Sequence, residues 1–252
     1  DLGTLAALVP EAVLGTKEAN QGAREEAYAL LVDMGHRMAR GGRINRAQAG
    51  TDVQDIVAAS VPEYVMMVAA GLAGASPRMI GASITALARL LYEFHLALPD
   101  DMLNELLTTM LVYLESTNRE IVKASLGFCK VATLSLSPQH IEQMLPSLVP
   151  ALLQIRHAHK NHFKAQVRHL MERLLRRFGE KTVSAHVDIE NQRLIANIRK
   201  RKERAKRRRA HTDEVEDETE ATARSGGMDA FEDALYGSDS DDSEDEDEEE
   251  AA

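Results

Sequence analysis

Residues 118–131, Asn-Arg-Glu-Ile-Val-Lys-Ala-Ser-Leu-Gly-Phe-Cys-Lys-Val, form the stretch that indicates the fold most directly. Its apolar side chains recur at three- and four-residue spacing, which is typical of a helix with one buried face. Ala124 is small enough to let a neighbouring helix approach closely, and we expect Leu126, Phe128 and Val131 to fill the space beside it.

Related strings stand on both sides of this stretch. Pro-Arg-Met-Ile-Gly-Ala-Ser occupies 77–83, and His-Phe-Lys-Ala occupies 162–165. The equivalent alanines Ala82, Ala124 and Ala165 are 42 and 41 residues apart, which matches the roughly 40–47-residue period of HEAT and armadillo units. The repeat therefore predicts an all-α, HEAT/armadillo-like α-solenoid segment, in which pairs of antiparallel helices stack on one another.

Turn-forming residues interrupt the helical pattern at regular places. Pro77 and Pro138 stand where a proline opens a helix, because the first helical position does not use its N–H within the helix. The expected breaks are Gly41-Gly42 with a polar loop to Thr51, Ala75-Ser76-Pro77, Pro99-Asp100-Asp101, Ser116-Thr117-Asn118, Ser137-Pro138 and His159-Lys160-Asn161. Alternating β-branched residues and hairpin turns are missing from the pattern, so we expect no strand.

The charge divides the chain into three blocks. Residues 1–155 contain 11 Lys and Arg against 16 Asp and Glu, residues 156–211 contain 18 against 5, and residues 212–252 contain 1 against 19. We therefore predict HEAT-like helical repeats over 1–184, a basic C-terminal helix over 185–211 and a disordered acidic tail over 212–252. Such asymmetry favours a partner that is a polyanion or another macromolecule.

Composition argues against several classes of protein. The single cysteine, Cys129, cannot form an internal disulfide, which favours a reducing compartment, and we expect it to be a small buried core residue. The sequence has no apolar run of membrane-spanning length and no signal-peptide layout. It also has no Gly-rich phosphate loop, nucleophile elbow or HExxH motif, so we expect neither an enzyme nor a cofactor.

Four histidines lie near one another in the sequence, namely His157, His159, His162 and His169. No cysteine or carboxylate is available beside them to complete a zinc site, so we assign no metal.

Basic residues follow helical geometry between 160 and 177. Phe163, Val167, Leu170, Leu174 and Phe178 are predicted to face inward. The cations opposite them are Lys160, Lys164, Arg168, Arg173, Arg176 and Arg177. A line of cations on a helix can follow the phosphates of a nucleic acid. The alternative is an ordinary solvated helix face.

A second basic stretch lies in a helix expected over 187–209, which begins amphipathic with Leu194, Ile195 and Ile198 on one side. Nine of its residues between 199 and 209 are cations, namely Arg199, Lys200, Arg201, Lys202, Arg204, Lys206, Arg207, Arg208 and Arg209. Such density is typical of a nuclear-import signal, a nucleic-acid patch or both. Because aromatic residues are scarce here, we expect contacts to the nucleic-acid backbone and low sequence specificity.

The acidic tail contains two features that are candidates for regulation or binding. Acidic neighbours make Ser238, Ser240 and Ser243 suitable for an acid-directed kinase. An apolar set three and four residues apart predicts a short amphipathic helix that binds a partner's groove, and its members are Met228, Phe231, Leu235 and Tyr236. The alternatives are a merely solubilising tail, or a tail that folds back on the basic helix and competes with nucleic acid.

Three long strings, 118–131, 159–179 and 194–200, resemble the eukaryotic family of ribosomal-RNA-processing HEAT-repeat factors. The resemblance covers much of residues 60–210 and implies that this chain is the C-terminal part of a larger, karyopherin-like solenoid. It also implies a place in early and small-subunit pre-ribosomes, with roles in ribosomal RNA maturation and subunit export. The family has no catalytic residues to carry over.

Together these observations predict a non-catalytic scaffold of nucleolar pre-ribosomal particles. Its expected partners are pre-ribosomal RNA, ribosome assembly factors, export machinery and a small GTPase, with no membrane and no small-molecule substrate. We expect it in the nucleolus and nucleus, with shuttling to the cytoplasm. The alternative is a karyopherin-like transport factor or adaptor that acts through a small GTPase and cargo.

Overall fold

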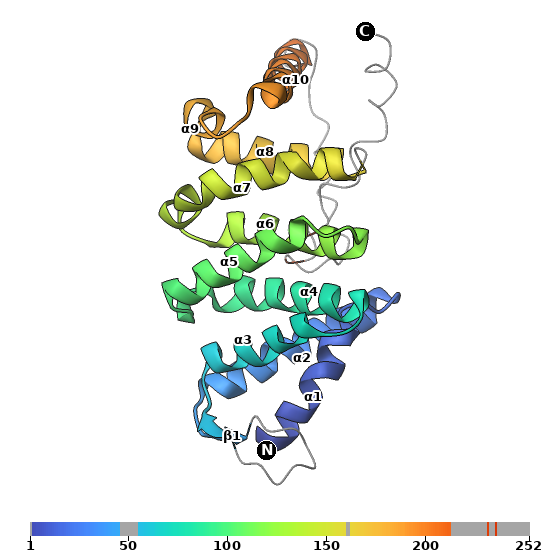
Figure 1. The fold of residues 1–252 in the computed structure, drawn as a ribbon, viewed down its shortest axis with the longest axis vertical. Helices are drawn as coiled ribbons and strands as arrows, with labels where there is room; N and C mark the ends of the chain where they lie inside the picture. Colours follow the sequence, from blue (N-terminus) through green and yellow to red (C-terminus); the bar gives the residue numbers. More distant parts are fainter. Residues whose placement is uncertain (1, 46–54, 160–161, 213–230, 232–234, 236–252) are drawn as a thin grey trace. The chain divides into compact units, whose positions relative to one another are not determined.

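The computed structural model describes residues 2–45, 55–159, 162–212, Phe231 and Leu235. Nearly all of them are helical (Figure 1). The helices are α1 Leu2–Gly15, α2 Gln21–Ala39, α3 Val61–Ala69, α4 Pro77–Phe94, α5 Asp100–Leu114, α6 Arg119–Ser135, α7 Pro138–Ala158, α8 Lys164–Phe178, α9 Glu180–Ser184 and α10 Gln192–Thr212. Short 3-10 turns lie at Ala70–Ala73, His95–Ala97 and Ile189–Asn191. The predicted all-α fold of paired helices is confirmed.

The chain forms two compact units that divide between Ser137 and Pro138. The first contains α1 to α6 and also Leu235, and the second contains α7 to α10. The domain boundaries predicted after residues 184 and 211 stay predictions, and the predicted disordered tail falls almost wholly outside the described residues.

The core of the first unit lies where α4 packs along α6. Ala82 on α4 and Ala124 on α6 are both buried, as the repeat predicted. Phe128 and Val131 are completely inaccessible to solvent, and Leu126 is also buried. Small side chains on two facing helices allow close approach, and the larger side chains beside them fill the remaining space.

Side-chain caps explain where the helices of this unit begin. The hydroxyl of Ser76 accepts a hydrogen bond from Met79 N at 3.2 Å, just before Pro77 opens α4. Asn118 Oδ1 accepts from Glu120 N at 2.9 Å and from Ile121 N at 3.3 Å at the start of α6. Each cap satisfies backbone donors that have no partner within the helix. The breaks expected at these positions are therefore confirmed.

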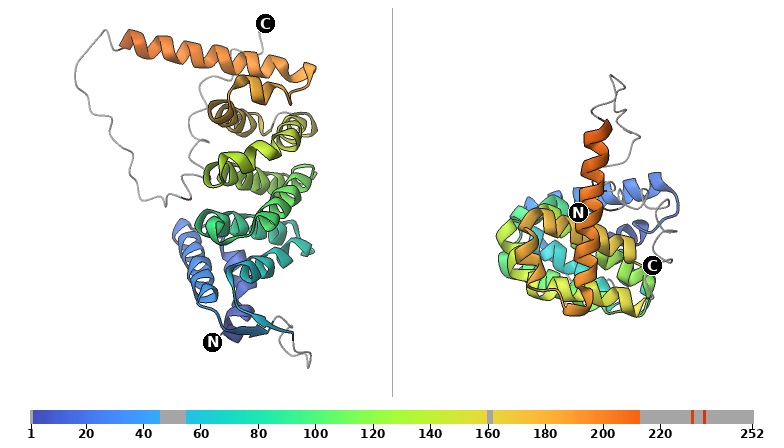
Figure 2. Two further views of the ribbon diagram at one scale, coloured as in Figure 1. Left: turned by 90° about the vertical axis from the view of Figure 1, so that its left-hand side faces the viewer. Right: turned by 90° about the horizontal axis from the view of Figure 1, so that it is seen from above.

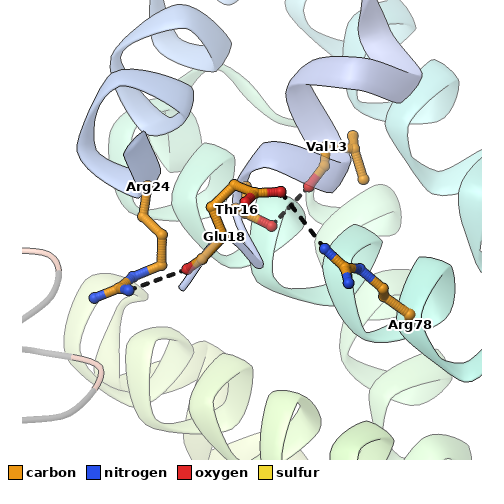
Figure 3. Close-up of polar contacts among 5 residues, drawn as sticks. All are labelled: Val13, Thr16, Glu18, Arg24 and Arg78. Carbon is orange, nitrogen blue, oxygen red and sulfur yellow. Dashed lines mark hydrogen bonds and ion pairs between the residues drawn. The ribbon is translucent and has the colours of Figure 1, made fainter. Parts of the chain in front are cut away.

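The turn between α1 and α2 connects these two helices to α4 (Figure 3). The hydroxyl of Thr16, which is buried, donates to Val13 O at 2.7 Å and has a longer contact of 3.4 Å to Ala82 O on α4. Arg24 Nη1 donates to Glu18 O at 3.1 Å, and Arg78 Nη2 lies 3.5 Å from Glu18 Oε1. Both partners of that ion pair are exposed, so Thr16 is the better candidate for a stabilising link.

The expectation of no strand was wrong in one place. β1 Arg43–Asn45 and β2 Ile56–Ala58 pair antiparallel, with Ile44 opposite Val57. Gly41 and Gly42 have φ of 78° and 122°, which turn the chain out of α2, and Ile44 is buried at the first unit's edge. The β-branched Ile44, Ile56 and Val57 favour the extended backbone once the turn brings them together.

The second unit is built from α7, α8 and the short α9, followed by the long α10 (Figure 1). α7 begins at Pro138, as predicted, and its apolar side chains Leu145, Val149 and Leu152 are buried. α7 packs against α8, and α8 in turn contacts α9 and α10. Within the described residues, we find no helix that is both long enough and apolar enough to cross a membrane.

Candidate nucleic-acid interface

The inward face of α8 positions its basic residues. Phe163, Val167, Leu170 and Leu174 are buried as predicted, whereas Phe178 is only half-buried at the end of the helix. The Arg177 guanidinium lies 5.6 Å from the centre of the Phe178 ring, a distance at which a cation and an aromatic ring attract one another. The apolar face thus directs the charged residues of α8 away from the core.

The cations of α8 cover a broad arc and do not form a single line. With 3.6 residues per turn, Lys164 and Arg173 fall on opposite flanks of the helix, with Arg176 between them. Arg176 is exposed, while Lys164, Arg168, Arg173 and Arg177 are half-buried. Lys160, predicted to be at the start of this set, lies outside the described residues. A broad cationic face suits a polyanion that crosses the helix.

Arg173 is the most unusual side chain of this face. Its Nη1 atom is buried and has no hydrogen-bond partner among the described residues. Burial lowers the pKa of Arg173, and the positive charge of Arg176 lowers it further. A buried donor of a charged group is costly without a partner. An anion bound at the accessible part of Arg173 and at Arg176 would reduce the repulsion between the two guanidinium groups.

α10 continues the basic character of the unit (Figure 2). Leu194, Ile195 and Ile198 are buried, so the predicted amphipathic start is confirmed. Figure 2 shows that the C-terminal half of α10 projects beyond the other helices of its unit. The exposed cations of α10 include Arg199, Lys200, Arg204 and Arg207, whereas Arg201 is half-buried. The side chains of four further predicted residues lie outside the described part, namely Lys202, Lys206, Arg208 and Arg209.

One ion pair links α10 to α9. Arg199 Nη1 lies 3.7 Å from Glu180 Oε1, and both side chains are more than half exposed. Such a pair contributes little to stability, because water screens the charges and two long side chains must be held in place. Arg199 therefore stays accessible to an anion that competes with Glu180.

Comparison with known proteins shows which family shares these features. No family model matches the chain. It is 38% identical over 245 residues to ribosomal RNA-processing protein 12 of Saccharomyces cerevisiae, and 35% identical over 206 residues to the RRP12-like protein of Homo sapiens. The chain belongs to the ribosomal RNA-processing protein 12 family. The resemblance found in the sequence is thereby confirmed.

The alignment to ribosomal RNA-processing protein 12 covers most of this chain but only a small part of each relative. It covers 96% of the chain for the S. cerevisiae protein and for a putative ribosomal RNA-processing protein 12 of Schizosaccharomyces pombe, which is 32% identical. For the human protein it covers 82%. The chain spans about one fifth of the length of the two yeast relatives and 15% of the human one.

The histidines near the α7–α8 turn have packing contacts. His159 is buried, and its ring meets that of Phe163 edge to face at 5.4 Å, while the ring of His162 meets Phe163 at 4.8 Å. In the described part of the chain, no group of three or more His, Cys, Asp or Glu is placed to hold a metal ion. These rings therefore stabilise the turn around Phe163.

The structure describes two of the candidate residues of the tail, Phe231 and Leu235. Met228, Tyr236, Ser238, Ser240 and Ser243 lie outside the described residues. Phe231 and Leu235 are described, have helical backbone and are buried. Sequence reasoning missed the residues that contact Leu235, which are Gly127 and Lys130 on α6, because no local pattern connects positions so far apart.

Proposed function

We propose that this chain is a non-catalytic binding segment that holds pre-ribosomal RNA during ribosomal RNA processing. The RNA-binding residues are the cations of α8 and α10, which contact phosphates, and Arg173 is the central one. The observation that carries the proposal is the cationic face of α8, where the half-buried Arg173 stands close enough to the exposed Arg176 for the two positive charges to repel one another. The name of the relatives of this chain, ribosomal RNA-processing protein 12, supports RNA as the polyanion.

The remaining parts of the proposal follow from this role. The helical pairs bind ribosome assembly factors within a pre-ribosomal particle, and the work takes place in the nucleolus and nucleus, with shuttling to the cytoplasm during subunit export. The dense basic run of α10 serves nuclear import, RNA contact or both. Cys129, the sole thiol of the chain, is buried on α6, which argues against its use as a nucleophile.

A salt titration tests the RNA contact directly. We compare the affinity of the full chain for a single-stranded RNA between 50 and 300 mM salt with that of the double variant Arg173→Gln and Arg176→Gln. Each lost phosphate contact reduces the slope of log affinity against log salt by about 0.7. We therefore expect the double variant to bind several-fold more weakly at low salt, with a slope smaller by about 1.4.

A matched control uses two exposed arginines of the first unit. Arg37→Gln and Arg40→Gln on and after α2 change the net charge equally, at positions far along the chain from α8. This control should keep the wild-type slope. Equal effects of the two double variants would mean that RNA responds only to net charge. Capture of a small GTPase without RNA binding would instead favour the transport alternative.

A further inference from the structure

Leu235 lies against α6, although it stands in the middle of the acidic tail. It is buried, and it belongs to the first compact unit together with α6. Lys130 Nζ donates a hydrogen bond to Leu235 O at 3.2 Å across a separation of 105 residues. Phe231, four residues earlier and also helical, is completely inaccessible to solvent.

Gly127 provides the space that Leu235 occupies. A Cβ atom on Gly127 would lie 2.7 Å from Leu235 Cδ1 and 3.6 Å from Leu235 Cγ. Among the described residues, Leu235 alone has atoms within 4 Å of that position, apart from the helix backbone and chain neighbours. A glycine in mid-helix is unfavourable for α6 itself. Its presence is explained by the close approach of Leu235.

Lys130 stands one turn further along α6, on the same side as Gly127. Its ammonium group donates to the backbone carbonyl of Leu235, a residue with helical backbone. The α6 surface thus combines a hollow for the apolar side chain of Leu235 with a cation for its backbone carbonyl. Both features recognise a short helical peptide.

We propose that the surface formed by Gly127 and Lys130 is a docking site for a helical apolar peptide, and that Leu235 of the same chain occupies it. The acidic tail is then attached to the folded body at Leu235, between two acidic stretches, residues 213–233 and 239–250. The proposal does not depend on RNA binding. It differs from the prediction of an external partner, because the occupant belongs to the chain itself.

Hydrogen exchange of the full chain tests the docking. We expect the amides of residues 231–237 to exchange at least tenfold more slowly than their intrinsic rates, because a docked segment keeps its amides hydrogen-bonded. The same protection at low and high protein concentration is the result expected for docking within one chain. Exchange at intrinsic rates would overturn the proposal, and so would protection that grows with concentration, which would indicate docking between two copies.

The variant Gly127→Leu fills the hollow, because even a Cβ at this position would lie 2.7 Å from Leu235 Cδ1, and leucine is a better helix former than glycine. We expect it to abolish the protection of residues 231–237, with the melting temperature of the chain unchanged or raised. Lys130→Met should weaken the protection partly, whereas the matched change Lys123→Met, at an exposed site on the same helix, should leave it intact. Retained protection in Gly127→Leu would contradict docking at this site.

Discussion

Cys129 is surrounded by the core of the first unit on α6. It is buried, and burial raises the pKa of its thiol from 9.0 to about 12. In a low-dielectric core the thiolate is disfavoured, because it loses the hydration that water gives it. Since this is the only cysteine of the chain, its chemistry can be followed without interference from other thiols.

The pH dependence of stability follows from this shift. An unfolded thiol ionises near pH 9.0, whereas the folded one stays protonated up to about 12. Below pH 9 both states are protonated, so Cys129 makes no difference there; as pH rises above 9, the unfolded state is favoured. The free energy of unfolding should fall by about 1 kcal/mol more between pH 7 and pH 10 than in Cys129→Ala. Urea titrations at the two pH values measure it, and parallel losses in both proteins would contradict the burial.

Single residues were predictable from the sequence where a helical period fixed them. Ala82 and Ala124 were assigned to packed positions because they are equivalent in the repeat of about 40 residues, and Phe128 because it follows Ala124 in the same helix; all three are buried. The half-burial of Arg173 was not predictable, since it depends on which neighbouring side chains cover the guanidinium. The contact between Leu235 and Gly127 was missed for the same reason.

At the scale of the element, α6 owes its start to Asn118. The side-chain oxygen accepts two backbone hydrogen bonds, from Glu120 and Ile121, which have no partner inside the helix. Because α6 packs along α4 and α5, fraying of its first turn would expose the buried Ile121 and Val122. The cap therefore protects the interface between these helices.

Asn118→Ala should lower the free energy of unfolding by about 1 kcal/mol, the usual cost of losing a side-chain cap. For a chain of this size, that corresponds to a fall of about 2–4 °C in the melting temperature. Thermal unfolding followed by circular dichroism measures the change. Asn118→Asp is the control, because a carboxylate can accept the same bonds and favours a helix N-terminus. Equal loss in both variants would show that the amide has another role.

The elements themselves were mostly predictable. Prolines and capping residues mark the starts of α4, α6 and α7, so the breaks between these helices could be located from the sequence. The strands β1 and β2 could not be predicted from the sequence, because each has only three residues. Ten residues, 46–55, also separate the two strands along the chain. Short strands carry too little alternation to be distinguished from a loop.

At the scale of the whole molecule, two oppositely charged regions share one chain. Residues 156–211 carry a net charge of +13, from 18 basic and 5 acidic residues, and residues 212–252 carry −18, from 1 and 19. Anchoring the tail at Leu235 would keep its acidic residues close to the folded body, which raises their effective concentration. If the acidic segment reaches the cations of α8 and α10, it competes with RNA phosphates for them.

Neutralising the end of the tail should therefore tighten RNA binding. The ten acidic residues between 239 and 250 are changed to Asn and Gln in the full chain, which keeps its length and leaves Leu235 in place. We expect a several-fold gain in affinity at 50 mM salt, and a smaller gain at 300 mM, because salt screens the competing charges. Fluorescence anisotropy with a labelled single-stranded RNA measures both values. If the acidic residues compete for the cations of α8, the gain should disappear when Arg173→Gln and Arg176→Gln are added. A gain in affinity that persists in this combined variant would show that the tail competes for other cations. If neutralising the tail gives no gain at all, the tail does not compete with RNA.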